Sequence, residues 1–135
     1  MWEYEHSVET VAEPAAVWRR YVDVAAWGAW DTSVERIEAH GPFAVGTEIS
    51  LTPVGQDQIR MRLTEVRDGE GFSDETAFGD LTVRFIHRLT PLPGRGTRVT
   101  HRVEVDGPGA EQLGPAITSD TPEAMAGLVK LAAED

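Results

Sequence analysis

Turn signals recur at short intervals between residues 41 and 107, and they constrain the fold more than any other feature of the sequence. Each signal is a Gly, Pro or Asp combination of the kind that joins antiparallel strands, and alternating apolar and polar residues lie between them. The six signals are Gly41-Pro42, Val54-Gly55, Asp68-Gly69, Gly79-Asp80, Pro93-Gly94-Arg95-Gly96 and Asp106-Gly107. The pattern after Ser33 therefore predicts six strands connected by short hairpins.

The residues before Ser33 predict one more strand and two short helices. Apolar and polar side chains alternate over residues 2–11, which is the period of a half-buried strand. Pro14 suits the first turn of a helix that we expect to end near Val22. The side chains expected to form its buried face are Pro14, Val17, Trp18, Tyr21 and Val22. Around Trp27 and Trp30 we expect a second short helix or a turn.

The end of the chain predicts a closing helix. From Gly109 onward the sequence is rich in alanine with apolar residues at helical spacing, and Pro122 is expected to interrupt the helix. A long antiparallel sheet with one apolar face must curve so that this face packs against another element. The C-terminal helix is the only long element that can fill the concave side of the sheet. We expect an α+β fold in which a curved seven-stranded antiparallel sheet surrounds the C-terminal helix. The 135 residues suit a single domain spanning 1–135.

Charge and composition exclude several function classes. The formal net charge of −11 has the wrong sign for binding phosphates, so we expect neither a nucleic acid nor an anionic membrane as partner. The absence of cysteine removes disulfides, thiolate nucleophiles and cysteine-ligated metals. No apolar run approaches the length of a membrane span, and the first ten residues carry three glutamates without an apolar stretch. We therefore expect a cytoplasmic protein.

Several short motifs together resemble the START-like, or SRPBCC, superfamily, and within it the polyketide cyclase/dehydrase type. The motifs are the opening strand, Val11-Ala12-Glu13-Pro14-Ala15-Ala16-Val17-Trp18, Asp23 with Trp27 and Trp30, Val45-Gly46-Thr47, and the ending from Pro122 to Glu134. The resemblance covers essentially the whole chain. It implies a helix-grip fold that encloses a hydrophobic pocket for a small organic molecule. It permits cyclase/dehydrase activity without implying a particular reaction, because members include carriers as well as enzymes.

Tight turns predict which side chains share the inner face of the sheet. If Asp68-Gly69 and Gly79-Asp80 are two-residue turns, Asp74 lies opposite both Leu63 and Phe85. The same turns place Met61 opposite Thr76 and Phe72 opposite His87. For the longer loop around Gly94, the most compact register sets His87 opposite His101. The predicted inner face comprises Ile59, Met61, Leu63, Phe72, Asp74, Thr76, Phe78, Val83, Phe85, His87, Val99, His101 and Val103.

Polar residues on this apolar face are the candidate catalytic groups. We identify His87 and His101 as candidate acid and base, because neutral imidazole can accept and return protons near neutral pH. Asp74 would orient a histidine or bind a substrate hydroxyl. The alternative is that each is a hydrogen-bonded core residue. A metal site formed by His6, His87 and His101 is a further reading, but strand histidines lack the diagnostic i, i+4 spacing, so we predict no metal and no cofactor.

Apolar neighbours of these groups are the candidate ligand-binding residues. Met125 and Leu128 on the C-terminal helix would form a lid over the pocket. Trp27 and Trp30 would cap one end of the sheet or gate the pocket. The full set is Trp27, Trp30, Met61, Leu63, Phe72, Thr76, Phe85, Val103, Met125 and Leu128. On the outer face, the predicted register aligns Arg62, Glu75, Arg84 and Glu104 as cross-strand ion pairs.

The sequence thus predicts a protein that binds a small hydrophobic or polycyclic molecule, with polyketide cyclase/dehydrase activity permitted by the resemblance. One alternative is a carrier or sensor in which the same residues only hydrogen-bond the ligand. Another is a protein-interaction module that uses a sheet edge or the tryptophan region, as in START-like relatives that resemble co-chaperones. The pattern favours no particular oligomeric state.

Overall fold

The computed structural model describes residues 1–134 and contains one seven-stranded sheet with three α-helices and a 3-10 helix. The elements run β1 (Trp2–Thr10), α1 (Pro14–Val22), η1 (Val24–Ala29), β2 (Val34–Ala39), β3 (Glu48–Pro53), β4 (Ile59–Arg67), β5 (Gly71–Phe78), β6 (Leu81–Pro91), β7 (Thr97–Asp106), α2 (Ala110–Thr118) and α3 (Thr121–Ala133). This is the predicted order of elements.

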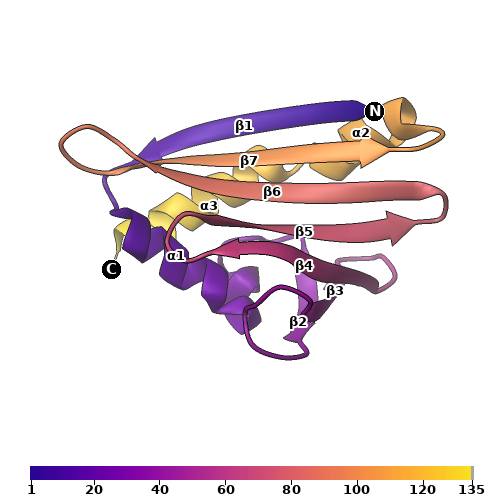
Figure 1. Cartoon of the computed structure of the whole chain (residues 1–135), viewed down its shortest axis with the longest axis horizontal. Coiled ribbons are helices and arrows are strands. Elements are labelled where there is room, and N and C mark those ends of the chain that lie inside the picture. The colour runs from indigo at the N-terminus through magenta and orange to yellow at the C-terminus, as the bar shows by residue number, and fades with distance from the viewer. Residues whose placement is uncertain (135) are drawn as a thin grey trace.

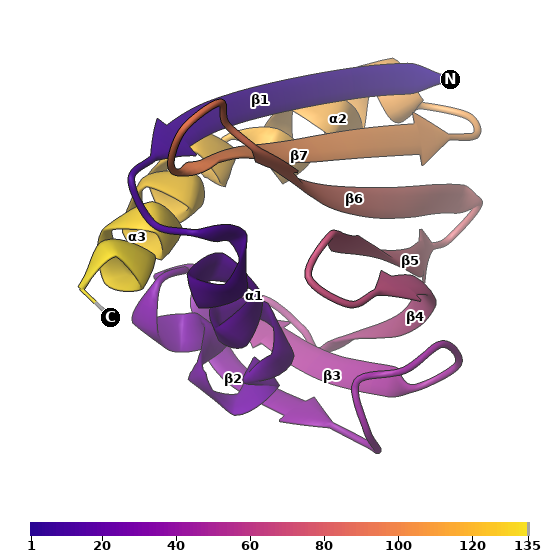
Figure 2. The ribbon, with the colours of Figure 1, turned by 60° about the vertical axis from the view of Figure 1, so that its left-hand side comes forward.

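The sheet is antiparallel throughout and has the strand order β1-β7-β6-β5-β4-β3-β2. It curves strongly from β1 to β2, and the helices α1 and α3 lie on its concave side (Figures 1 and 2). Because β1 pairs with β7, the chain closes back on its first strand and leaves β1 and β2 as the two edges. The predicted helix-grip architecture is confirmed.

The cross-strand pairs on the concave face match the predicted register. Asp74 pairs with both Leu63 and Phe85, and His87 pairs with His101. The connection after β4 differs from the prediction. Arg67 pairs with Gly71, so the loop has three residues instead of two, and a register shift between residues 63 and 65 compensates for the extra one.

On the convex face, ion pairs cross the strands as expected. Arg84 donates to Glu75 at 3.1 Å on one side and to Glu104 at 2.9 Å on the other. These partly exposed pairs stabilise the sheet by about 0.2 to 1 kcal/mol each. They account for Arg84 as a structural residue. Arg62 is the cross-strand partner of Glu75 as predicted, but among the described residues it forms no ion pair with that glutamate.

The C-terminal helix is divided, as Pro122 predicts. The helix α2 ends at Thr118 and α3 begins at Thr121, with Pro122 in its first turn. Proline fits that position because its missing N–H would be unpaired there in any case. None of the described helices is long and apolar enough to cross a membrane.

The division of the helix coincides with a division of the core. The larger cluster joins α1, η1 and α3 to the middle of the sheet, and its fully buried members include Val17, Met125 and Leu128. A smaller cluster lies under α2 and consists of Leu81, Val83, Val103, Val105 and Ala110. Some inward side chains of the sheet, among them Phe85 and His87, are only half-buried.

Candidate functional site

Three histidines lie side by side on the concave face. His6 on β1 pairs with His101 on β7, which in turn pairs with His87 on β6. The rings of His87 and His101 meet edge to face with their centroids 4.5 Å apart. The sheet thus brings together the two histidines that the sequence predicts as acid and base.

The helix α1 supplies a fourth polar ring that the sequence prediction did not include. The hydroxyl of Tyr21 lies 2.8 Å from Nε2 of His101, and the Tyr21 ring also lies edge to face with that of His87. Tyr21 is fully buried, and burial raises the pKa of its phenol. The sequence indicated this role only in that Tyr21 carries a hydroxyl group on the otherwise apolar face of the predicted helix.

A backbone hydrogen bond fixes the tautomer of His87. Its Nδ1 lies 3.1 Å from the carbonyl oxygen of Phe72, and a carbonyl can only accept, so Nδ1 carries the proton. The ring of Phe72 stacks on the imidazole with centroids 3.9 Å apart. The lone pair of His87 is therefore on Nε2, which is the atom available to accept a proton or a hydrogen bond.

Desolvation keeps both imidazoles neutral, although His101 is buried and His87 only half-buried. Desolvation lowers the pKa of His87 to about 4, and its hydrogen bond to Phe72 opposes this only in part. The pKa of His101 is lowered well below its usual value, first by desolvation and then by the neighbouring His87 and His6. Because a buried cation loses its hydration, neither ring is protonated at neutral pH.

Asp74 is a buried carboxyl without a partner. Only 2% of the residue is exposed, and its Oδ1 has no hydrogen-bond partner. Burial raises its pKa to about 8, so at neutral pH the carboxyl is mostly protonated and can donate a hydrogen bond. Through its pairing with Phe85, Asp74 is a diagonal neighbour of His87, a relation that typically separates positions by about 7 to 8 Å.

The site therefore places a neutral proton donor and a neutral proton acceptor on the same apolar face of the sheet. Asp74 can donate a proton, and Nε2 of His87 can accept one. The groups around them are also uncharged, because Tyr21 keeps its phenol proton. Within residues 1–134, no group of three or more potential ligand side chains is arranged to hold a metal ion. The three histidines share a row but not a metal-binding geometry.

The predicted ligand-binding residues divide among three surroundings. Trp27, Trp30, Met61, Leu63, Phe72, Met125 and Leu128 belong to the larger core cluster. Val103 belongs to the smaller cluster, and half-buried Phe85 packs against it. Thr76 is buried, and its hydroxyl donates to the carbonyl oxygen of Arg60 at 2.5 Å.

A strip of half-buried side chains runs between the two clusters. Tyr4, His6, Phe85 and His87 all point to the concave side and remain partly exposed. In a closed hydrophobic core, aromatic side chains are usually buried and seldom this exposed. We call these four residues the concave strip. It shares His87 with the site formed by Asp74, His87 and His101.

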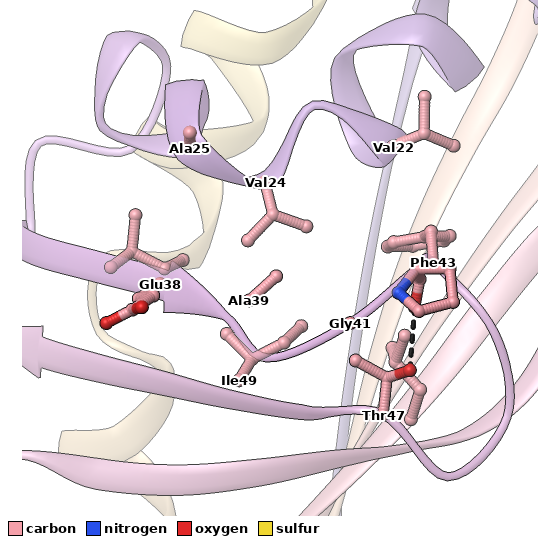
Figure 3. Close-up of a pocket in the computed structure, with 12 residues that line it drawn as sticks. Val22, Val24, Ala25, Glu38, Ala39, Gly41, Phe43, Thr47 and Ile49 are labelled. Atoms are coloured by element: carbon pink, nitrogen blue, oxygen red, sulfur yellow. Dashed lines mark hydrogen bonds between the residues drawn. The ribbon is translucent and has the colours of Figure 1, made fainter.

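An apolar pocket of about 290 Å³ lies elsewhere, between the end of α1, η1 and the hairpin of β2 and β3 (Figure 3). Of the predicted ligand-binding residues, only Leu63 contributes to it. Half of its lining residues come from the loop between β2 and β3 and from η1, where sequence periodicity carries no information. The sequence analysis therefore did not identify it.

Comparison with known proteins gives one family and a common fold. The family described as "Polyketide cyclase / dehydrase and lipid transport" matches residues 1–134. No curated protein is similar enough in sequence to count as a match. Many solved structures share the fold.

Three of these structures show the extent of the likeness. Ara h 8.0201 has a TM-score of 0.80 at 15% identity, with 99% of each chain covered. The protein MLL2253 from Mesorhizobium loti has a TM-score of 0.81 at 15% identity, with 96% of each chain covered. Norcoclaurine synthase from Thalictrum flavum, in complex with dopamine and hydroxybenzaldehyde, has a TM-score of 0.80 at 18% identity, covering 98% of this chain and 87% of that one. At these identities the likeness establishes the fold alone.

Proposed function

Because the chain belongs to the polyketide cyclase/dehydrase and lipid transport family, we propose that it binds a small, largely apolar organic molecule against the concave strip and catalyses a proton-transfer reaction such as dehydration. The observation that carries the proposal is the buried, unpartnered carboxyl of Asp74 beside the neutral imidazole of His87. An unsatisfied polar group costs about 1 to 3 kcal/mol when it is buried. A ligand oxygen that accepts the Asp74 proton would recover that free energy.

In this proposal Asp74 is the general acid. Its pKa of about 8 lies close to neutral pH, where a general acid combines the right protonation state with a useful driving force. The protonated carboxyl would donate to a carbonyl or hydroxyl oxygen of the bound molecule. Its apolar neighbour Phe85, which is half-buried, would contact the hydrocarbon part.

His87 is the proposed base. Its Nε2 would remove a proton from the carbon next to the carbonyl, while Asp74 protonates the departing hydroxyl. The carbon–oxygen bond then breaks, a carbon–carbon double bond forms and water leaves. Proton transfer from the His87 imidazolium to the Asp74 carboxylate would restore the starting state. Tyr21 and His101 would hold the edge-to-face packing that orients the His87 ring.

A second candidate function is supported by the low pKa of His87. An imidazole with a pKa of about 4 is a weak base at neutral pH, whereas efficient general bases have a pKa near the working pH. This favours a carrier, in which Asp74 and His87 hydrogen-bond an apolar molecule without converting it.

A β-hydroxyketone separates the two functions. The aldol of benzaldehyde and acetone carries one ring and gains a conjugated double bond on dehydration, which ultraviolet absorbance detects. If the chain is a dehydrase, it accelerates this reaction, and both Asp74→Asn and His87→Gln lower the rate about a hundredfold or more. Binding, followed by protein NMR, should change little.

The matched control is His40→Gln, because His40 is exposed and bonded to Ser50 outside the site. It should retain the wild-type rate. Turnover that survives in both site variants would refute the catalytic assignment. Binding to the concave strip without turnover in the wild type would identify a carrier.

A further inference from the structure

The apolar pocket beside η1 is separate from the site of the proposed function. It opens where α1 ends, and its walls come from η1, β2 and the loop that joins β2 to β3 (Figure 3). The buried floor is formed by Val24, Ile49 and Leu63. At about 290 Å³ its volume is near the lower end of the range for small-molecule sites, about 300 to 1,000 Å³.

The lining offers almost no polar group to a ligand. The hydroxyl of Thr47 donates to the carbonyl oxygen of Pro42 at 2.7 Å, so the loop itself uses this donor. Glu38 is the one charged residue of the lining, and it is exposed. No lysine, arginine or histidine lines the pocket. An anionic ligand would lose its hydration without gaining a cation, so the lining suits a neutral one.

Two side chains separate this pocket from the candidate site. Leu63 forms part of the floor and is the cross-strand partner of Asp74. Phe43 forms part of the wall, and its ring lies edge to face with that of Phe72 at 5.1 Å. A molecule in the pocket would therefore contact the outer side of Leu63 and Phe43, while Asp74 and His87 lie beyond them.

Several apolar side chains that line the pocket are exposed or only half-buried. Val22 ends α1 with 39% of its surface exposed, although helical spacing predicted it to be buried. Ile37, Ala39 and Phe43 face it and are only half-buried. Covering these side chains with a ligand would remove apolar surface from water, which is the main source of affinity in such sites.

We propose that this pocket is a second binding site, and that its ligand is a small, neutral, apolar molecule with up to three aromatic rings. This site is independent of the proposed function, because none of its side chains acts on a proton. A peptide segment would need a longer groove than a pocket of about 290 Å³ provides.

Two dyes that share a ring skeleton test the ligand class. N-Phenylnaphthylamine is neutral, and anilinonaphthalene sulfonate adds one negative charge to the same rings. The neutral dye should bind saturably and shift the methyl NMR signals of Val22, Val24, Ala25, Ile37 and Ala39. The sulfonate should bind at least about tenfold more weakly, because its charge has no partner in the pocket.

Paired alanine substitutions test the location. Ala25 is exposed and lines the pocket, whereas Ala29 is exposed on the same 3-10 helix and does not. Ala25→Phe should weaken binding of the neutral dye about tenfold or more, and Ala29→Phe should leave it unchanged. Ala39→Met narrows the pocket from the opposite wall and should act like Ala25→Phe.

The outcomes distinguish the pocket from the concave strip. Asp74→Asn and His87→Gln should leave binding of the neutral dye unchanged, so failure of the dehydrase or carrier proposal would not affect this one. NMR shifts confined to the aromatic ring signals of the concave strip would overturn the second site. An absence of saturable binding, or an affinity unchanged in both Ala25→Phe and Ala39→Met, would also overturn it.

Discussion

The hydroxyl of Tyr21 and Nε2 of His101 form a buried hydrogen bond of 2.8 Å between residues 80 positions apart in the chain. The bond joins α1 to β7 and is the polar link between the helical layer and the histidine row. Tyr21→Phe leaves the ring in place but removes the hydroxyl, so Nε2 of His101 loses its partner. We expect the free energy of unfolding to fall by about 1 to 3 kcal/mol.

Urea denaturation measures this change, and Tyr4→Phe is the matched control. Tyr4 is half-buried on the same face, and within residues 1–134 its hydroxyl makes no hydrogen bond. Its removal should alter stability by much less. Equal effects of the two substitutions would show that the Tyr21 bond does not stabilise the fold.

Asp74→Asn should change how stability depends on pH. The pKa of Asp74 rises from its ordinary value of 3.8 to about 8 on folding. The folded state therefore holds a proton that the unfolded state releases, and stability falls as the pH rises through this window. At about 1.4 kcal/mol for each tenfold change in proton affinity, the total effect is several kcal/mol.

Relative to the wild type, the Asp74→Asn variant should become progressively more stable from about pH 4 to pH 8, because it has no proton to lose. Thermal unfolding across this range gives the difference. Asp57→Asn, at an exposed position, serves as the control. A constant difference between wild type and Asp74→Asn would mean that the carboxyl is not protonated in the folded protein.

His87→Gln should have the opposite pH dependence. Folding lowers the pKa of His87 from 6.5 to about 4, so the unfolded state binds the proton more readily. Neutral His87 therefore contributes to the free energy of unfolding above pH 6.5, and this contribution is lost as the pH falls toward 4. Over this range the wild type should lose stability relative to His87→Gln. Chemical denaturation at each pH measures the difference, and a wild type that gains stability relative to His87→Gln as the pH falls would contradict the assignment.

Gly127→Ala should destabilise the protein although it lies in a helix. Alanine in a helix usually gains about 0.5 to 1 kcal/mol over glycine. A Cβ at Gly127 would overlap the carbonyl oxygen of Trp30, which belongs to the backbone and cannot rotate away. We expect a loss of about 1 to 3 kcal/mol in the free energy of unfolding.

Gly28→Ala is the comparison. A Cβ at Gly28 meets only the carbonyl oxygen of Val34 at 3.7 Å, an ordinary contact distance. Thermal unfolding should show little change for Gly28→Ala and a lower melting temperature for Gly127→Ala. Equal melting temperatures would indicate that α3 can move away from Trp30 without loss of packing.

The fold could be predicted because alternation and turns act together. The pairing of His87 with His101 follows from the requirement that both strands keep their apolar residues inward. The pairing of Leu63 with Asp74 was also correct, although the loop after β4 is longer than expected. The bulge near residue 64 cancels the extra loop residue because the apolar face has to return to the core side.

The site could be predicted only as far as the sheet determines it. Register places His87, His101 and Asp74 on one face. The Tyr21 hydroxyl comes from a helix whose buried face periodicity predicts, but whose position and angle on the sheet it does not. The pocket at η1 was missed because Phe43 lies on a loop and Val22 is exposed despite its helical spacing. Both features depend on how separate elements pack in three dimensions.

Because the C-terminal helix is interrupted between α2 and α3, we expect α2 and α3 to unfold locally with different free energies of opening. The helix α2 covers only the smaller cluster, whereas α3 is anchored by Met125 and Leu128 in the larger one. Amide hydrogen exchange should therefore be faster in α2 than in α3, as for a subunit of structure that opens before global unfolding. Such an opening would uncover Phe85, which packs against the smaller cluster, and a molecule bound to the concave strip as proposed would then exchange with solvent while the rest of the fold stays closed.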